Sequence, residues 1–469
     1  MMLRLATIVA VAAVAVGCAT SGAGTGGSGG GASSIVPAGA LAYVSIDTDA
    51  SSAQLKEASA ILAKFPIRAK LVRQIRTSMS GGGTNAGALL SAAGPRVDLA
   101  ALRVNGKEGA VGFTKPSDEK AFAAELAKAS RPPVHETIDG WTVFAEKQAF
   151  IDAVKSRTGS IEDDPEFKAA MKSLPDDALA RAYASTAGAQ AALGRASGTI
   201  GVAGQALGPA ASSKWLAAAV TAKDGAFKLE LHAKSRTASS GGSGAAGIAD
   251  EIPTGAIVAL SLTRGVGALP ASARQQAATM SKQLGFDVGA LVGALDGPVI
   301  AYLRPGVPLP EVTIAAKPAQ PQAAERAIGQ LIERYTKQLG SPKKVQVEGV
   351  TMEKIDLGSV GIFYGVAGDT LVVTDSQNAL AELKGSSGHL SDDDVFKEAK
   401  AGSGLPDGQQ GFLYVNVKDA LPALQGVAGL ASQSLPPSVE ANLRPLRSLL
   451  VFGTRDGDLQ SFVAYVKTG

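Results

Sequence analysis

The sequence predicts an α+β protein in which largely antiparallel sheets pack with helices. Hairpins are mixed with helices along the chain, whereas a parallel sheet would need strict alternation of strands and helices. Two pairs of predicted strands are joined by tight turns, at Asp139-Gly140 and at Gly368-Asp369. Apolar residues at helical spacing over residues 54–65 indicate a helix between strands.

The predicted elements follow one order through the first half of the body. They are a strand at 41–47, the helix at 54–65, a strand at 97–104 after Gly94-Pro95, a strand ending at Lys115-Pro116, a helix beginning near Ser117 and Asp118, the hairpin 135–145, a helix after Asp163-Asp164, a small-residue helical stretch at 187–213, and the hairpin 217–223 with 226–233. The same pattern returns in the second half, which predicts two tandem duplicated lobes.

Six short motifs recur in the same order and support this duplication. They are Pro37-Ala-Gly-Ala-Leu with Pro253-Thr-Gly-Ala-Ile, Gly94-Pro95 with Gly297-Pro298, Lys115-Pro116 with Lys317-Pro318, Asp163-Asp164 with Asp392-Asp393, Leu174-Pro175-Asp176 with Leu405-Pro406-Asp407, and Asp224-Gly225 with Asp456-Gly457. The spacing also predicts extra strand material in the second lobe around residues 360–374.

The chain is accordingly divided into five parts. Residues 1–17 are predicted to be a lipoprotein signal peptide, 18–34 a Gly/Ser-rich tether, 35–235 the first α+β repeat, 236–247 a linker, and 248–469 the second repeat. A tether of this composition is a flexible coil with a reach of roughly 20 Å.

The first residues predict export and lipid anchoring. Arg4 precedes a charge-free apolar stretch at 5–16, which is too short to span a bilayer and typical of a signal peptide. The end of this stretch, Ala15-Val16-Gly17-Cys18, resembles the bacterial lipobox, although Ala15 stands where Leu is usual. Acylation of Cys18, the only cysteine, would hold the protein on the extracytoplasmic side of a membrane, at the cell surface or in the periplasm. The alternative is an ordinary secretory signal with an incidental thiol.

The segment Pro37-Ala-Gly-Ala-Leu-Ala-Tyr43-Val44-Ser-Ile-Asp47-Thr48-Asp49 follows the lipobox and tether. Together with the next helix it resembles the bacterial domain of unknown function 3352. The resemblance implies an exported envelope protein and carries no catalytic residue over to this chain.

Composition excludes several classes of function. The 45 Lys and Arg nearly balance 42 Asp and Glu, which argues against a nucleic-acid partner, and a single cysteine excludes a disulfide framework or a cysteine-based zinc site. The three histidines, His135, His232 and His389, lie far apart and predict no metal site.

The acidic runs could in principle bind a hard cation, but helix capping is the preferred interpretation. These runs are Asp163-Asp164 and Asp392-Asp393-Asp394. Asp164 precedes Pro165, as an N-cap precedes proline at the first helical position, and the remaining ligands of a calcium loop are missing.

One set of motifs resembles that of penicillin-binding serine enzymes: Ser117-x-x-Lys120, Ser376-x-Asn378 and Lys467-Thr468-Gly469. The first motif lies in one repeat and the others in the second, and the duplicate of Ser117 is Ala319, so a serine hydrolase is not favoured. A G-x-S-x-G match at 26–30 and a G-x-G-x-x-G match at 242–247 lie in the Gly-rich linkers. We attribute both to the composition of these linkers and not to a nucleophile or phosphate site.

The sequence therefore predicts a lipid-anchored binding or scaffold protein of the bacterial envelope, without a cofactor or catalytic set. The alternative is a carrier of an apolar ligand or lipid. For that alternative, the charge-poor stretches 187–213 and 420–435 are the candidates to line a groove. Their ordinary interpretation is Ala- and Gly-rich core helices packed on a sheet.

Overall fold

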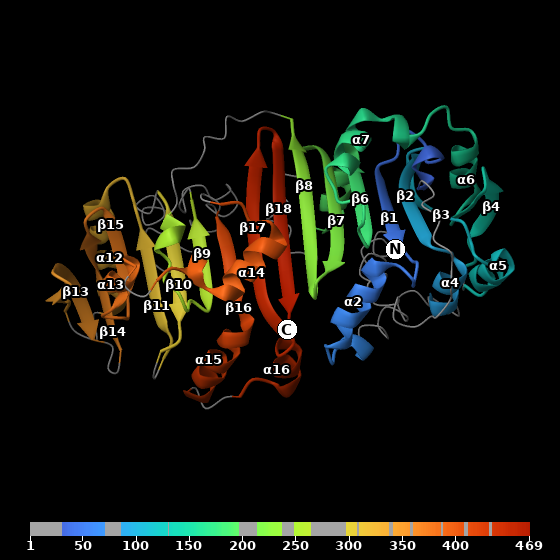
Figure 1. Ribbon diagram of the computed structural model, residues 1–469. Helices are drawn as coiled ribbons and strands as arrows, with labels where there is room; N and C mark the ends of the chain where they lie inside the picture. The colour runs from blue at the N-terminus through green and yellow to red at the C-terminus, as the bar shows by residue number, and fades with distance from the viewer. Residues whose placement is uncertain are drawn as a thin grey trace. The chain divides into compact units, whose positions relative to one another are not determined.

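The computed structural model is a mixed α+β structure in which the strand pairs of the described residues are antiparallel, so the predicted class is confirmed (Figure 1). It describes residues 31–70, 86–129, 131–196, 213–236, 248–263, 297–306, 309–336, 341–356, 360–385, 388–407, 411–430 and 434–469. The chain divides into two compact units. Unit 1 comprises Met1–Ser239, Arg455–Val463 and Thr468, and unit 2 comprises Ser240–Thr454, Ala464–Lys467 and Gly469.

Unit 1 contains a sheet with the strand order β4-β5-β3-β2-β1-β6-β7-β8. The strands are β1 (Ala42–Asp47), β2 (Arg96–Val104), β3 (Lys107–Thr114), β4 (Val134–Ile138), β5 (Trp141–Ala145), β6 (Ala180–Ser185), β7 (Ser213–Lys223) and β8 (Ala226–Ser235). The β4–β5 turn at Asp139-Gly140 has positive φ at both residues, as the predicted tight hairpin requires.

Helices cover both faces of the unit 1 sheet. They are α2 (Ala53–Ala63), α4 (Ala86–Ala92), α5 (Glu119–Ala127), α6 (Gln148–Lys155), α7 (Pro165–Lys172) and α8 (Thr186–Ala196), with the short 3-10 turns η1 (Ala32–Ser34) and η2 (Ile161–Asp163). Helices α6 and α7 pack on the face that carries Tyr43, and α2 packs on the opposite face through Leu55 and Ile61. Both faces are therefore apolar.

The main core of unit 1 lies under α6 and α7. Phe167 of α7 meets the edges of Tyr43 and Tyr183, with ring centroids 5.5 and 5.2 Å apart. The last residues of the predicted tether already belong to this core, because Ala32–Ser34 form η1, Ala32 is buried, and its amide donates to the buried carboxylate of Asp98 at 2.7 Å. Burial raises the pKa of Asp98.

Unit 2 contains a sheet with the strand order β12-β13-β14-β15-β11-β10-β9-β16-β17. The strands are β9 (Val258–Leu262), β10 (Val299–Arg304), β11 (Glu311–Ala316), β12 (Lys343–Val347), β13 (Val350–Asp356), β14 (Gly361–Ala367), β15 (Thr370–Thr374), β16 (Phe412–Asn416) and β17 (Leu446–Asp456). Strand β18 (Leu459–Thr468) has residues in both units.

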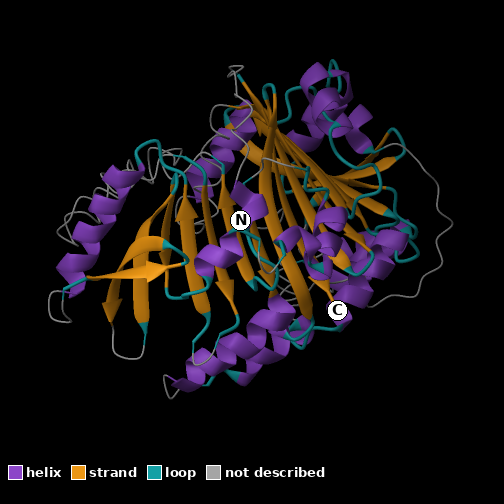
Figure 2. Cartoon of the chain, turned by 60° about the vertical axis from the view of Figure 1, so that its left-hand side comes forward, coloured by secondary structure: helices purple, strands orange, loops and turns teal. Residues whose placement is uncertain are grey.

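Two helices of unit 2 pack on its sheet: α12 (Pro321–Thr336) packs on β14 and β15, and α14 (Asp394–Ser403) packs on β16. The unit also contains α13 (Ala379–Leu383), α15 (Val417–Leu430) and α16 (Pro437–Leu443), with the 3-10 turns η4 (Ile248–Glu251) and η6 (Leu390–Asp392). Figure 2 distinguishes these helices from the strands by colour. Helix α14 inserts Phe396 between Phe412 and Tyr414, with ring centroids 5.6 and 5.0 Å away.

One sequence prediction needs correction. The helical stretch predicted at 187–213 ends as α8 at Ala196, residues 197–212 lie outside the described residues, and Ser213 already begins β7. Strands do occupy residues 360–374, where strand material is predicted: β14 pairs with β15, and β15 pairs with β11.

Candidate functional site

The two faces of the unit 2 sheet differ in chemistry. One face carries Tyr302, Phe412 and Tyr414 and packs under α14. The other side carries only Ala, Val, Leu and Ile from β15 to β17, in three rows that cross the strands, and we call this part the apolar face. Beyond β15 the same side carries Tyr364, which pairs with Val373 and packs under α12. Row 1 is Val373, Ile314, Ala301, Leu260, Leu413 and Val451; row 2 is Val312, Leu303, Val258, Val415 and Leu449; row 3 is Leu371, Ala316, Val299 and Leu262.

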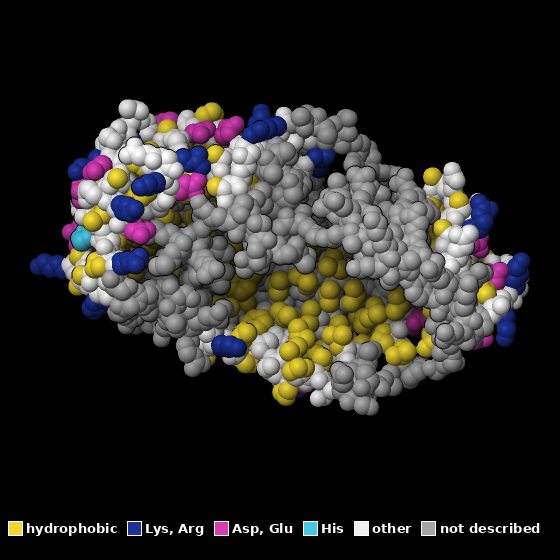
Figure 3. Space-filling view, turned by 180° about the vertical axis from the view of Figure 1, so that it is seen from behind, with side chains coloured by type: hydrophobic (Ala, Val, Ile, Leu, Met, Phe, Trp, Pro, Cys, Tyr) yellow, Lys and Arg dark blue, Asp and Glu magenta, His cyan; other side chains and the backbone are white. Residues whose placement is uncertain are grey.

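Rows 1 and 2 of the apolar face are incompletely covered. Val312, Ile314 and Leu413 are 43%, 40% and 37% exposed. Row 3 is different, since Leu371, Ala316 and Val299 are buried. Figure 3, which views the molecule from behind, shows hydrophobic side chains gathered over a hollowed part of the surface. Large apolar side chains grouped in this way are typical of a binding surface.

The three rows of the apolar face are long and contain no hydrogen-bonding side chain. Six strands at a spacing of about 4.8 Å give row 1 a span of about 24 Å, and successive rows lie about 7 Å apart. At the β11 end of row 2, the carboxylate of Asp375 accepts a hydrogen bond from the amide of Val312 at 2.8 Å. The rows themselves can hold an apolar group by removing it from water.

Unit 1 has a similar apolar face with more small residues and more cover. Its side chains are Leu99, Val44, Ala182, Ala218 and Leu231; Ala101, Ala42, Ala184, Leu216 and Ala233; and Val97, Ile46, Ala180, Val220 and Leu229. Helix α2 packs on Val220. Helix α8 approaches so closely that a Cβ on Gly188 would lie 1.9 Å from the carbonyl oxygen of Leu41. None of these side chains is exposed, so unit 2 carries the stronger candidate site.

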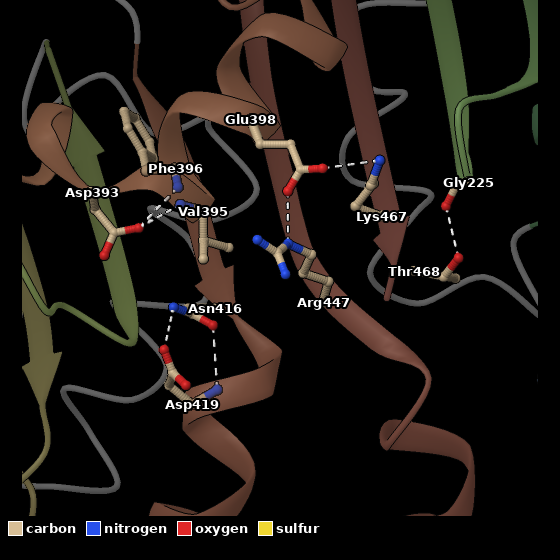
Figure 4. Close-up of polar contacts among 10 residues, drawn as sticks. All are labelled: Gly225, Asp393, Val395, Phe396, Glu398, Asn416, Asp419, Arg447, Lys467 and Thr468. Carbon is tan, nitrogen blue, oxygen red and sulfur yellow. Dashed lines mark hydrogen bonds and ion pairs between the residues drawn. The ribbon is translucent and has the colours of Figure 1, made fainter.

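The paired aspartates cap helices, as predicted. Asp164 accepts a hydrogen bond from the amide of Glu166 at 2.7 Å, and Asp393 accepts from the amides of Val395 and Phe396 at 2.8 and 3.0 Å (Figure 4). Among the described residues, no group of three or more His, Cys, Asp and Glu side chains is placed to hold a metal ion.

The histidines are not brought together within a unit. His135 pairs with Phe144 between β4 and β5, and His232 lies half-buried in β8, where burial lowers its pKa. His389 precedes η6 in unit 2 and forms a β-bridge with Pro253. Each of the three lies in a strand or at a turn, in its own local setting.

The residues of the serine-enzyme motifs have local partners. The hydroxyl of Ser117, in unit 1, donates to the carbonyl of Ser91 at 3.2 Å. In unit 2, the buried Ser376 accepts from the amide of Asn378 at 3.3 Å, and Lys467 pairs with Glu398 at 3.0 Å. These contacts explain the residues as turn and ion-pair elements. Cys18 and the Gly-rich matches at 26–30 and 242–247 lie outside the described residues.

Glu398 joins α14 to the strands beneath it in unit 2. Its carboxylate binds Arg447 at 2.6 Å and Lys467 at 3.0 Å (Figure 4). Partial burial disfavours the charged carboxylate, but the bonds from Lys467 and Arg447 outweigh it and lower the pKa of Glu398.

We expect Glu398→Gln to weaken the pH dependence of stability in acid. A lowered carboxyl pKa gives stability that is complete above the unfolded value of about 4.3 and is lost as the pH falls through the folded value. The parent should therefore lose its advantage over the variant below about pH 4, as measured by urea unfolding across a pH series. A gap between the two proteins that stays constant with pH would contradict this assignment.

The sequence contained a signal for the apolar face that helical periodicity did not reveal. Strands β9, β10 and β16 lie in nearly continuous apolar runs, which indicate a sheet that is apolar on both faces. The sequence analysis assigned a possible groove to the helical stretches 187–213 and 420–435, and not to these strands.

No described helix is both long and apolar enough to cross a membrane.

Comparison with known proteins gives no close relative. No family model matches the chain, and no curated protein matches it, so the resemblance to domain 3352 stays a prediction. Among solved structures, crystal form IV of TP0453 matches with 13% identity and a TM-score of 0.26, over 45% of this chain and 76% of that one. Crystal form I of TP0453 matches with 11% identity and a TM-score of 0.25, over 48% and 93%. Likeness this low supports no argument about fold or function.

Proposed function

We propose that this protein is a lipid-anchored, extracytoplasmic binding protein that holds an apolar ligand on the apolar face of unit 2. The observation that carries the proposal is the exposure of Val312, Ile314 and Leu413 within rows made entirely of aliphatic side chains. This favours the apolar-ligand alternative over a general protein scaffold.

Size and composition favour a small apolar ligand over a protein partner. Three rows about 7 Å apart, crossing about 24 Å, enclose on the order of 340 Å². A stable protein interface covers about 800 Å² on each partner and makes about one hydrogen bond per 100–200 Å². The apolar face has under half that area and offers no polar side chain, whereas an apolar ligand needs neither.

The anchor is proposed on the sequence. Acylation of Cys18, followed by a flexible tether that ends before η1 (Ala32–Ser34), would hold the protein at a membrane surface, from which an apolar ligand could be taken. The buried bond from Ala32 to Asp98 would give the tether a firm attachment to unit 1. Cys18→Ala should release the protein from membranes in a fractionation experiment, whereas continued membrane association would refute the anchor.

We also propose that the two units are copies of one ancestral fold. The order β5-β3-β2-β1-β6-β7 in unit 1 matches β15-β11-β10-β9-β16-β17 in unit 2. A cross-strand pair adds support, since Tyr43 faces Ala100 in unit 1 and Ala259 faces Tyr302 in unit 2. The tyrosine lies on β1 in unit 1 but on the strand matching β2, which is β10, in unit 2. Each pair contains one Tyr and one Ala, so the total side-chain volume is the same, as a tightly packed core favours.

Val312→Asp tests the proposed function. The environment-sensitive dye ANS should bind the parent protein, and the variant should bind it about ten-fold more weakly, because the new carboxylate must be desolvated under the dye. Val439→Asp in α16 is the matched control, since Val439 is also a valine with 43% exposure and lies away from the apolar face. Equal loss in both variants, or no binding by the parent, would refute the site.

A further inference from the structure

We infer that the ligand class of the apolar face is a linear acyl chain that lies across the strands, between rows 1 and 2. This inference rests on the proposed function and narrows it. It depends on the absence of aromatic and polar side chains from the three rows and on the furrow that the two open rows form.

The distribution of aromatic residues argues against a ligand with flat rings. Tyr302, Phe412 and Tyr414 all lie on the helix-packed face of the unit 2 sheet, where they are buried. The apolar face presents only aliphatic side chains, and Tyr364, which follows Val373 on the same side, is buried under α12, so a ring system on the rows would find neither a stacked nor an edge-to-face partner. The three rows also offer no side chain to bond a hydroxyl or a ring carbonyl, and Asp375, at the β11 end, already accepts a hydrogen bond from the amide of Val312.

The open rows form a furrow that suits a flexible linear chain. Along each strand the residues of rows 1 and 2 are two positions apart, with a residue of the other face between them, so the rows run parallel about 7 Å apart and perpendicular to the strands. The furrow crosses β11, β10, β9, β16 and β17 and is about 19 Å long at a strand spacing of about 4.8 Å. Ala301 lies between Ile314 and Leu260 in row 1, and its short side chain makes this side of the furrow shallower there.

The exposure of the side chains along the furrow also indicates a ligand chain that is buried on one side only. Val312 and Ile314 are exposed at the β11 end, and Leu413 is exposed on β16, while the residues between them are half-buried. An acyl chain laid across these side chains would bury one side of each methylene and leave the other side outward. Its affinity should therefore grow with length, by less per methylene than complete burial would give.

A chain-length series on the full protein tests the inference. Linear fatty acids of increasing length, measured by displacement of ANS, should bind about two-fold more tightly per added methylene until the chain exceeds about 19 Å, and then level off. Val312→Asp should weaken every member of the series, and Val439→Asp should weaken none. Circular dichroism establishes that both variants are folded.

The outcomes separate this inference from the proposed function. If ANS binding depends on Val312 but fatty-acid affinity is independent of length, the acyl-chain assignment is wrong and the apolar site stands. The same holds if pyrene, a fused-ring probe, displaces ANS as well as the best fatty acid does. If the parent protein binds neither ANS nor any fatty acid, both proposals fail together.

Discussion

Replacing Arg304 by methionine should destabilise unit 2 by about 3–5 kcal/mol, the largest effect expected of a single substitution here. The guanidinium of Arg304 on β10 pairs with Glu382 of α13, and the two side chains are 21% and 10% exposed. Removing the cation would leave the Glu382 carboxylate poorly hydrated and without its counter-charge. Urea unfolding, followed by circular dichroism, measures the loss.

The pair itself should contribute little, although removing one partner costs much. Arg304 Nε and Glu382 Oε2 are buried without hydrogen-bond partners among the residues that the structure describes, so the pair does not recover the full cost of its desolvation. If the units are copies, the matching residues of unit 1 are Leu102 and Ala153. The double variant Arg304→Leu, Glu382→Ala should therefore be close to the parent in stability. A single Arg304→Met variant as stable as the double variant would contradict this account.

Replacing Gly94 by alanine should destabilise unit 1 by about 3 kcal/mol or more. Gly94 has a φ of +87°, and a Cβ there would lie 2.2 Å from the carbonyl oxygen of Lys115. The positive φ costs of order 1–3 kcal/mol for a residue with a side chain, and the collision with backbone adds overpacking of about 1–3 kcal/mol. Thermal or urea unfolding of the variant gives the sum.

Gly140→Ala is the matched control for this prediction. Gly140 also has a positive φ, +77°, but no heavy atom lies within 4 Å of its Cβ position. It should lose only the conformational part, about 1 kcal/mol. Equal effects at Gly94 and Gly140 would refute the role of the contact with Lys115. Gly297 should behave as Gly94 does, since its Cβ would lie 2.1 Å from the carbonyl oxygen of Lys317.

These glycines explain why two of the repeated motifs occur together. The sequence analysis recognised Gly94-Pro95 and Lys115-Pro116 as separate recurring pairs. In the fold they meet, because the turn at Gly94 lies against the end of β3, and Gly297 lies in the same way against the residue after β11. A contact between residues this far apart along the chain has no local sequence pattern.

Local residue patterns were enough to predict the α+β class, the tight hairpins and the capped helices, because turn residues, alternation and capping act within a few positions. Asp139-Gly140 and Asp393 needed no distant partner to be interpreted correctly. Only the tertiary structure decided which side of the unit 2 sheet keeps Val312, Ile314 and Leu413 exposed, and that Arg304 meets Glu382. The physical reason is that exposure and pairing depend on strand order and on cover by other segments, which join residues far apart in the chain.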